Sequence, residues 1–185
     1  MMIGHDVDPA LDERPDCTEA AESLYREVRN WLNREAEMLD GFQEREWLDA
    51  MVDPAIVYRV PLRQTVQRAR GTGFVADAYH MNETYGSLKT RVARLASVYA
   101  YGEDPPARTR HFISNIRVRS QANDQVQVKS NVMLCRSRGD AAILGIMTGE
   151  RQDILVRHDG TLKLLRRVVL LDFSVLETPN MATLF

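Results

Sequence analysis

The stretch RHFISNIRVRSQANDQVQVKSNVML, residues 110–134, decides the fold of this chain. Alternate positions are mostly apolar in both halves, from Phe112 to Val118 with Ser114 as an exception, and again from Val126 to Leu134 with Ser130 as an exception. Alternation with a period of two is typical of a strand with one buried face. The polar residues 121–124 lie between the halves and read as a turn. The stretch therefore predicts two long strands joined as an antiparallel pair.

Three more strands are expected outside this pair. Ala141 to Val156 and Leu162 to Phe173 are long apolar-rich segments, and His158-Asp159-Gly160 between them is a hairpin signal. Ile56 to Leu62 alternates as well. Pro61 within it indicates the edge or the end of a strand, because proline donates no hydrogen bond to a neighbouring strand.

Two helices are expected before the first strand. One is predicted to begin at a Thr18 cap and to carry an apolar stripe to Leu39, with Glu35 as the single polar member of the stripe. The other covers Gln43 to Met51. Residues 1–17 are polar and contain two prolines, so they predict a flexible arm ahead of one domain, residues 18–185.

A third helix is expected in the middle of the chain. Six apolar residues keep a regular spacing of four and three, which predicts a helix from its cap at Asn82 to Tyr99, with Leu88 and Val92 in the core. The preceding segment, Gln64 to Ala78, reads as a long exposed excursion. At the far end, the apolar residues from Met181 to Phe185 predict a tail that docks.

The order of these elements predicts the fold class. Helices come first and long strands follow, which is typical of an α+β protein. We expect N-terminal helices packed on one face of a curved, long-stranded antiparallel sheet. A doubly wound parallel sheet is excluded, since its helices and strands would alternate along the chain.

Composition narrows the choice of partners. The 185 residues are 44% hydrophobic and 27% charged, with a net charge of −2, as in ordinary globular proteins. Nucleic acid is excluded as a partner, because there is no basic excess to neutralise phosphates. No apolar run approaches the roughly 18 residues of a membrane span, and the acidic first residues lack a signal peptide's apolar region. These features predict a cytoplasmic protein with no membrane contact.

The histidines and cysteines do not form a metal motif. Cys17 and Cys135 are far apart, and neither begins the Cys-x-His or Cys-x-x-His pair that a Rieske cluster requires. The histidines are also scattered: His5, His80, His111 and His158. Phosphate-binding glycine loops and a G-x-S-x-G elbow are missing from the sequence. We therefore expect no catalytic, cofactor-binding or metal residues in this chain.

Two readings remain open for the polar residues of the strands. Asp53, Tyr58, His111 and Asp153 could converge in a pocket as a general acid and base, although Asp53 before a proline is typical of a turn. The charged strand residues offer a second reading, because consecutive residues point to opposite faces. One arginine of each charged strand should then face the inner side, among the arginines Arg151, Arg166 and Arg167. These charges are either solvated on the sheet face or paired with a carboxylate, within the chain or on another chain; the available carboxylates are Asp153, Glu150 and Asp172.

Five segments together carry a resemblance to a known family, although no single one is a catalytic signature. They are 35–40 with 46–48, 58–63, 104–115, 149–155 and 166–172. In their order and spacing the chain resembles the small (beta) subunit of bacterial aromatic-ring-hydroxylating dioxygenases, in the biphenyl, toluene and naphthalene branch. Ala107 departs from the branch, which usually has Ser there. The resemblance covers about Ala20 to Phe185.

The resemblance implies a fold, a partner and a division of labour. The fold would be a nuclear-transport-factor-2-like (NTF2-like, cystatin-like) cone. The alpha subunit would hold the 2Fe-2S Rieske cluster and the mononuclear Fe(II), and would perform the cis-dihydroxylation of aromatic hydrocarbons with electrons from a ferredoxin and a reductase. The beta subunit would be structural, within an α3β3 hexamer. We expect its interface to include the following residues: Arg110, His111, Arg151, Asp153, Arg166, Arg167 and Phe185. The alternative is a free-standing NTF2-like dehydratase or isomerase.

Overall fold

The computed structural model describes residues 18–67, 69, 71–95, 106–120, 124–140, 144–175 and 183–185. The predicted arm, residues 1–17, lies outside these ranges. Within them the chain forms α1 (Glu22–Asp40), α2 (Glu44–Met51) and α3 (Tyr85–Leu95). The strands are β1 (Thr18–Glu19), β2 (Val52–Arg63), β3 (Phe74–Glu83), β4 (Arg108–Ser120), β5 (Gln125–Ser137), β6 (Gly145–His158) and β7 (Thr161–Leu171).

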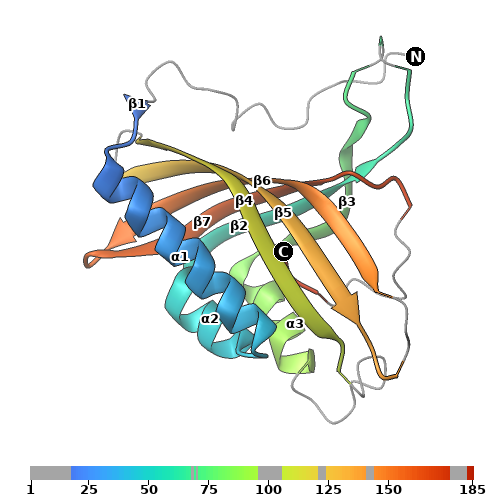
Figure 1. Ribbon diagram of the computed structural model, residues 1–185, viewed down its shortest axis with the longest axis horizontal. Helices are drawn as coiled ribbons and strands as arrows, with labels where there is room; N and C mark the ends of the chain where they lie inside the picture. The colour runs from blue at the N-terminus through green and yellow to red at the C-terminus, as the bar shows by residue number, and fades with distance from the viewer. Residues whose placement is uncertain are drawn as a thin grey trace.

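The strands form one sheet in the order β1-β4-β5-β6-β7-β2-β3. Figure 1 shows the sheet curving around the three helices, which lie together on one side of it. The predicted α+β architecture is confirmed. One pair within this largely antiparallel sheet departs from the pattern, because β2 pairs with β7 in parallel. Hairpins force their two strands to be antiparallel, whereas β2 and β7 are joined by a long connection that leaves either direction open.

The first two helices bury the residues that their patterns indicate. Val28 and Leu32 of α1 and Trp47 of α2 are fully buried in the core between helices and sheet. The predicted cap is wrong, however. Thr18 belongs to β1 and pairs with Ser120 of β4, and the helix begins four residues later without a side-chain cap.

The predicted excursion and the third helix are both partly wrong. Residues 74–83 form β3, which pairs antiparallel with β2, so Asn82 is a strand residue opposite Arg59 rather than a helix cap. The helix proper starts at Tyr85. Met81 fitted the helical spacing because the end of an edge strand and the following helix both send apolar side chains into one core. Leu88 and Val92 are buried, as predicted.

A bulge in β4 reverses the alternation that predicted this strand. The register with β5 shifts between Ser114 and Arg117, and Asn115 adopts a positive φ of 51°. An extra residue in one strand turns all later side chains to the opposite face. Phe112 is therefore 49% exposed on the outer face, whereas Val118 is 6% exposed and belongs to the core.

Gly149 of β6 leaves no room for a larger side chain, because the backbone of the neighbouring strand β7 lies against it. A Cβ atom there would lie 2.6 Å from the Leu170 carbonyl oxygen. Gly149→Ala should lower the free energy of unfolding by about 1–3 kcal/mol through overpacking, measured by urea denaturation. Gly145→Ala in the same strand is the matched control, because its Cβ would meet its nearest atom at 3.6 Å. Equal midpoints for both variants would contradict the prediction.

Candidate functional site

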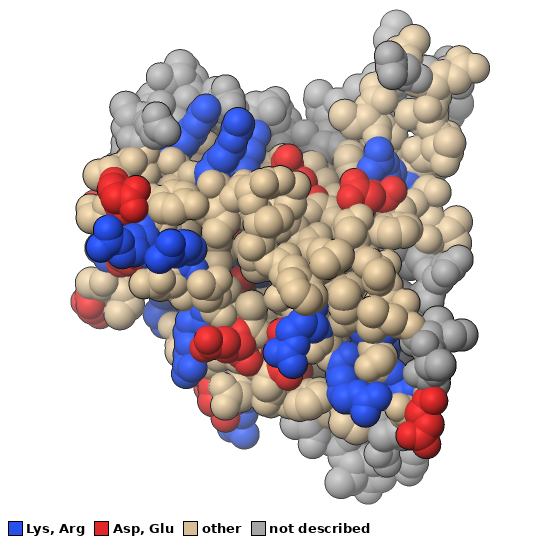
Figure 2. All heavy atoms as spheres, viewed as in Figure 1, with Lys and Arg blue, Asp and Glu red and all other residues tan. Residues whose placement is uncertain are grey.

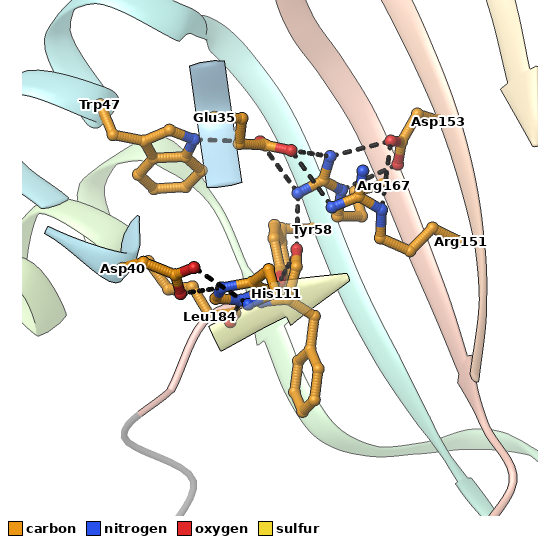
Figure 3. A network of polar contacts seen from close by, with 10 residues as sticks. Glu35, Asp40, Trp47, Tyr58, His111, Arg151, Asp153, Arg167 and Leu184 are labelled. Atoms are coloured by element: carbon orange, nitrogen blue, oxygen red, sulfur yellow. Dashed lines mark hydrogen bonds and ion pairs between the residues drawn. The ribbon is translucent and has the colours of Figure 1, made fainter. Parts of the chain in front are cut away.

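The interior of the cone contains four charged side chains, which we call the ion cluster: Glu35, Arg151, Asp153 and Arg167. Glu35 comes from α1, Arg151 and Asp153 from the inner face of β6, and Arg167 from β7 opposite Asp153. All four side chains are at most 1% exposed. Figure 3 shows Arg167 lying between the two carboxylates.

Arg167 is the best-satisfied member of the ion cluster. Its Nε and Nη2 donate to the two carboxylate oxygens of Asp153, both at 2.8 Å. Its Nη1 and Nη2 also donate to Glu35, at 3.0 and 2.8 Å. Planar bidentate contacts of this kind are the strongest ion pairs that proteins form. Burial alone would lower the pKa of Arg167, but the charges of Asp153 and Glu35 outweigh it and raise that pKa.

Arg151 is held less completely. Its Nη1 donates to Glu35 at 3.2 Å and its Nε lies 3.9 Å from Asp153. Among the described residues, Nε and Nη2 of Arg151 have no hydrogen-bond acceptor. Burial, together with repulsion from Arg167, lowers the pKa of Arg151. The second arginine is therefore held in the interior mainly by Glu35.

Glu35 links the helices to the sheet. Besides the two arginines, Trp47 Nε1 of α2 donates to Glu35 Oε1 at 3.0 Å. Burial alone would raise the pKa of Glu35. The positive charges of Arg167 and Arg151, with hydrogen bonds from Arg167 and Trp47, outweigh burial and leave the pKa below its ordinary value. The single polar residue in the apolar stripe of α1 is thus the centre of the site.

The predicted docking tail is confirmed for its described residues, Thr183–Phe185, which we call the tail. Leu184 and Phe185 are 3% and 1% exposed. The Phe185 N–H donates to the Tyr58 hydroxyl at 2.8 Å, and that hydroxyl and Arg167 Nη1 both donate to the Phe185 main-chain oxygen, at 3.1 and 2.6 Å. Met181 lies outside the described residues.

His111 connects the tail to α1. Its Nδ1 lies 2.6 Å from Asp40 Oδ1 and its Nε2 lies 3.0 Å from the Leu184 oxygen. Burial alone would raise the pKa of Asp40, but hydrogen bonds from the side chain and backbone of His111 lower it. A largely apolar cavity of about 320 Å³ lies beside this contact, with Phe42, Val92, His111 and Thr183 in its wall.

The four candidate acid and base residues do not form one open pocket, because Asp53 lies apart from the other three. Asp53 accepts from the Ala55 N–H at 2.7 Å and contacts His158 Nε2 at 2.6 Å, five positions along β2 from Tyr58. Tyr58 and Asp153 are 0% exposed and already hydrogen-bonded within the chain. The acid–base interpretation is therefore not supported by the arrangement of these residues.

The expected interface residues divide between interior and surface. Five of them lie in the interior, and each makes at least one polar contact within this chain: His111, Arg151, Asp153, Arg167 and Phe185. Arg110 is exposed on the outer face of β4, 3.6 Å from Asp40, and Arg166 is half-buried on the outer face of β7. Of the two locations considered for charge pairing, the structure shows the one within the cone.

An exposed apolar surface on the outer face was missed by sequence reasoning. We call it the outer patch and define it as Phe112, Met133, Leu144 and Ile146. Phe112 of β4 stands opposite Met133 of β5, and Ile146 lies on the next strand, opposite Cys135. Figure 2 shows a broad uncharged area in the middle of the drawn face, with arginine, lysine and carboxylate side chains around it. The bulge in β4 hid this surface, because it separates outward Phe112 from inward Val118.

The described part of the chain contains neither a metal-binding cluster nor a membrane-spanning helix. No three His, Cys, Asp or Glu side chains in it are grouped so that they could hold a metal ion. Within the same ranges, no helix has the length and apolar character needed to cross a membrane.

Comparison with known proteins agrees with the fold. A family model described as the ring hydroxylating beta subunit matches residues 34–178. The beta subunit of an N,N-dimethyl phenylurea N-demethylase from Sphingobium sp. (strain YBL2) is 35% identical over 157 residues, which are 84% of this chain and 88% of that protein.

Two solved structures show the same architecture. A naphthalene 1,2-dioxygenase with indole in its active site has a chain with a TM-score of 0.79 and 26% identity, covering 90% of this chain and 88% of that one. The beta subunit of a ring-hydroxylating dioxygenase from Novosphingobium aromaticivorans has a TM-score of 0.67 and 20% identity, covering 88% and 96%. The protein is thus an NTF2-like cone of the kind that serves as a non-catalytic oxygenase subunit.

The chain belongs to the ring-hydroxylating dioxygenase beta subunit family. It is the beta component of an oxidoreductase, and membership implies an alpha subunit as its partner. The resemblance that the sequence carried is confirmed.

Proposed function

We propose that this chain is the structural stem of an α3β3 terminal oxygenase in the cytoplasm. In this assembly the alpha subunit carries the 2Fe-2S Rieske cluster and the mononuclear Fe(II), and receives electrons from a ferredoxin and a reductase. The beta chain acts through one domain, residues 18–185.

The observation that best supports this role is the contrast between the inner and outer faces of the sheet. Inside, the polar groups of the ion cluster bind one another and the tail, so they hold the cone together. Outside, the outer patch exposes four large apolar side chains. Contiguous exposed apolar surface with a polar margin is typical of a protein interface.

We propose that the seven expected interface residues contribute in two ways. Arg110 and Arg166 lie on the outer face and contact a neighbouring subunit directly. The interior residues act indirectly, because they fix the positions of the strands that carry the outer patch; they are His111, Arg151, Asp153, Arg167 and Phe185.

Assembly can be tested by native mass spectrometry of the chain co-expressed with its alpha subunit. The wild-type complex is expected at α3β3 stoichiometry. Phe112→Glu and Arg110→Glu should each weaken association about tenfold or more, because each puts a carboxylate into a desolvated contact. Lys89→Glu is the control, because Lys89 is exposed on α3, and it should leave assembly unchanged. A wild type that stays free of alpha, or variants that assemble like wild type, would refute the proposal.

A further inference from the structure

The described end of the chain is bound in the way that proteins bind a peptide ligand. The Leu184 oxygen, the Phe185 N–H and the Phe185 oxygen contact side chains of three different strands. None of these contacts is part of the backbone ladder of the sheet. The side chains of Leu184 and Phe185 are buried among the apolar residues of the core. Recognition by convergent side chains and an apolar slot is typical of a ligand site.

The side chains that hold the tail are also positioned by contacts that do not involve it. Arg167 keeps both carboxylates of the ion cluster, with four hydrogen bonds, when the tail is left out of account. His111 is fixed by two contacts with Asp40, through its ring and through its backbone N–H. Tyr58 lies on β2 directly opposite Arg167, and the Arg167 guanidinium lies 5.9 Å from the centre of its ring. A receptor whose groups are fixed before binding loses little entropy when a ligand arrives.

A cavity adjoins this site. The cavity of about 320 Å³ is lined by Thr183, Leu184 and His111, so it adjoins the bound tail. Its other walls are largely apolar and come from α1, α2 and α3, from the turn at Phe42 and from residues 106–109. The contact between His111 and the Leu184 oxygen therefore lies beside a hollow and not in solid core.

We infer that the interior of this cone is a binding site for a hydrophobic peptide segment that contains an aromatic residue, and that Leu184 and Phe185 occupy it as an internal ligand. The Tyr58 hydroxyl hydrogen-bonds to the N–H and the oxygen of the aromatic residue. Arg167 hydrogen-bonds to the same oxygen, and His111 contacts the carbonyl oxygen of the preceding residue. The phenyl ring fills an apolar slot. The tail and an external peptide of this kind compete for the same groups.

The test uses the full chain with the ligand side chains removed, Leu184→Ala/Phe185→Ala, and fluorescein-labelled Thr-Leu-Phe as the probe. Fluorescence anisotropy should show saturable binding at least tenfold tighter than to wild type, whose own tail fills the site. Thr-Leu-Ala should bind at least tenfold more weakly than Thr-Leu-Phe. Adding Tyr58→Phe to the emptied variant should weaken Thr-Leu-Phe binding about tenfold. Equal binding to wild type and to the folded emptied variant would overturn the inference, as would the absence of saturable binding.

A second measurement keeps the inference testable if the emptied variant does not fold. In the intact chain, Tyr58→Phe removes the acceptor of the Phe185 N–H while keeping the ring in place. Hydrogen exchange of the Phe185 amide should then be at least tenfold faster than in wild type, whereas Tyr79→Phe, also a strand residue, should leave it unchanged. The same exchange rate in wild type and Tyr58→Phe would show that the tail is held by packing alone.

Discussion

Glu35→Gln is expected to lower the free energy of unfolding by about 3–5 kcal/mol, since it leaves two buried arginines facing a single carboxylate. The amide keeps the size of the side chain, so the loss reports charge and not a cavity. For a chain of this length the melting temperature should fall by roughly 6–20 °C. Differential scanning calorimetry measures the change directly.

The matched control is Glu37→Gln, two residues along the same helix. Glu37 contacts Arg34 at 3.6 Å, but both side chains are well exposed, so the pair is screened by solvent. Its loss should change stability by less than about 0.5 kcal/mol. If the two variants melt together, Glu35 is not the centre of the ion cluster.

Acid titration gives a second readout of Glu35. Its pKa lies below the ordinary value of 4.5, so it contributes stability that is present above pH 4.5 and is lost as the pH falls through the lowered pKa. Wild type should therefore lose stability steeply below about pH 4.5. Glu35→Gln should show a shallower slope there, because a neutral amide has no proton to gain. Parallel slopes would contradict the assignment.

Leu88→Ala is expected to lower the free energy of unfolding by about 2–5 kcal/mol, the usual cost of a buried leucine and the cavity that it leaves. Leu88 is 0% exposed and packs in the main core. Lys89→Ala, on the exposed side of the same turn, is the control and should change stability by less than about 0.5 kcal/mol. Urea denaturation of wild type, Leu88→Ala and Lys89→Ala measures these changes in stability. A midpoint for Leu88→Ala equal to that of wild type would contradict the burial of this helix in the core.

Much of this architecture could be predicted from periodicity. The two N-terminal helices and the four later strands each have a long apolar pattern, and such a pattern is enough to predict the type of element. β3 was not predicted, because an edge strand has a neighbouring strand on one side only and its pattern of buried and exposed residues is weak. The reversal in β4 escaped because a bulge depends on the conformation of one residue, Asn115, rather than on a pattern.

The site was predicted in part. Alternation predicted one inward arginine in each charged strand, pairing with a carboxylate was one of the two interpretations, and Asp153 was among the candidates. Glu35 was not, because it lies 132 positions from Arg167 in sequence and only the closed fold brings the two together. A signal existed nonetheless. A charged residue inside the apolar stripe of a helix needs a buried partner, and Glu35 is the one polar member of the stripe in α1.

The parallel pairing of β2 with β7 has a consequence for biosynthesis. β2 leaves the ribosome more than a hundred residues before the strand beside which it belongs, and Glu35 emerges earlier still. Contacts so distant in sequence close late and slowly. The nascent helices and β2 must therefore wait, with apolar surface uncovered, until β7 and the tail have been synthesised. During that interval the chain is at its most vulnerable to aggregation, and demand for chaperones or for a partner subunit is greatest.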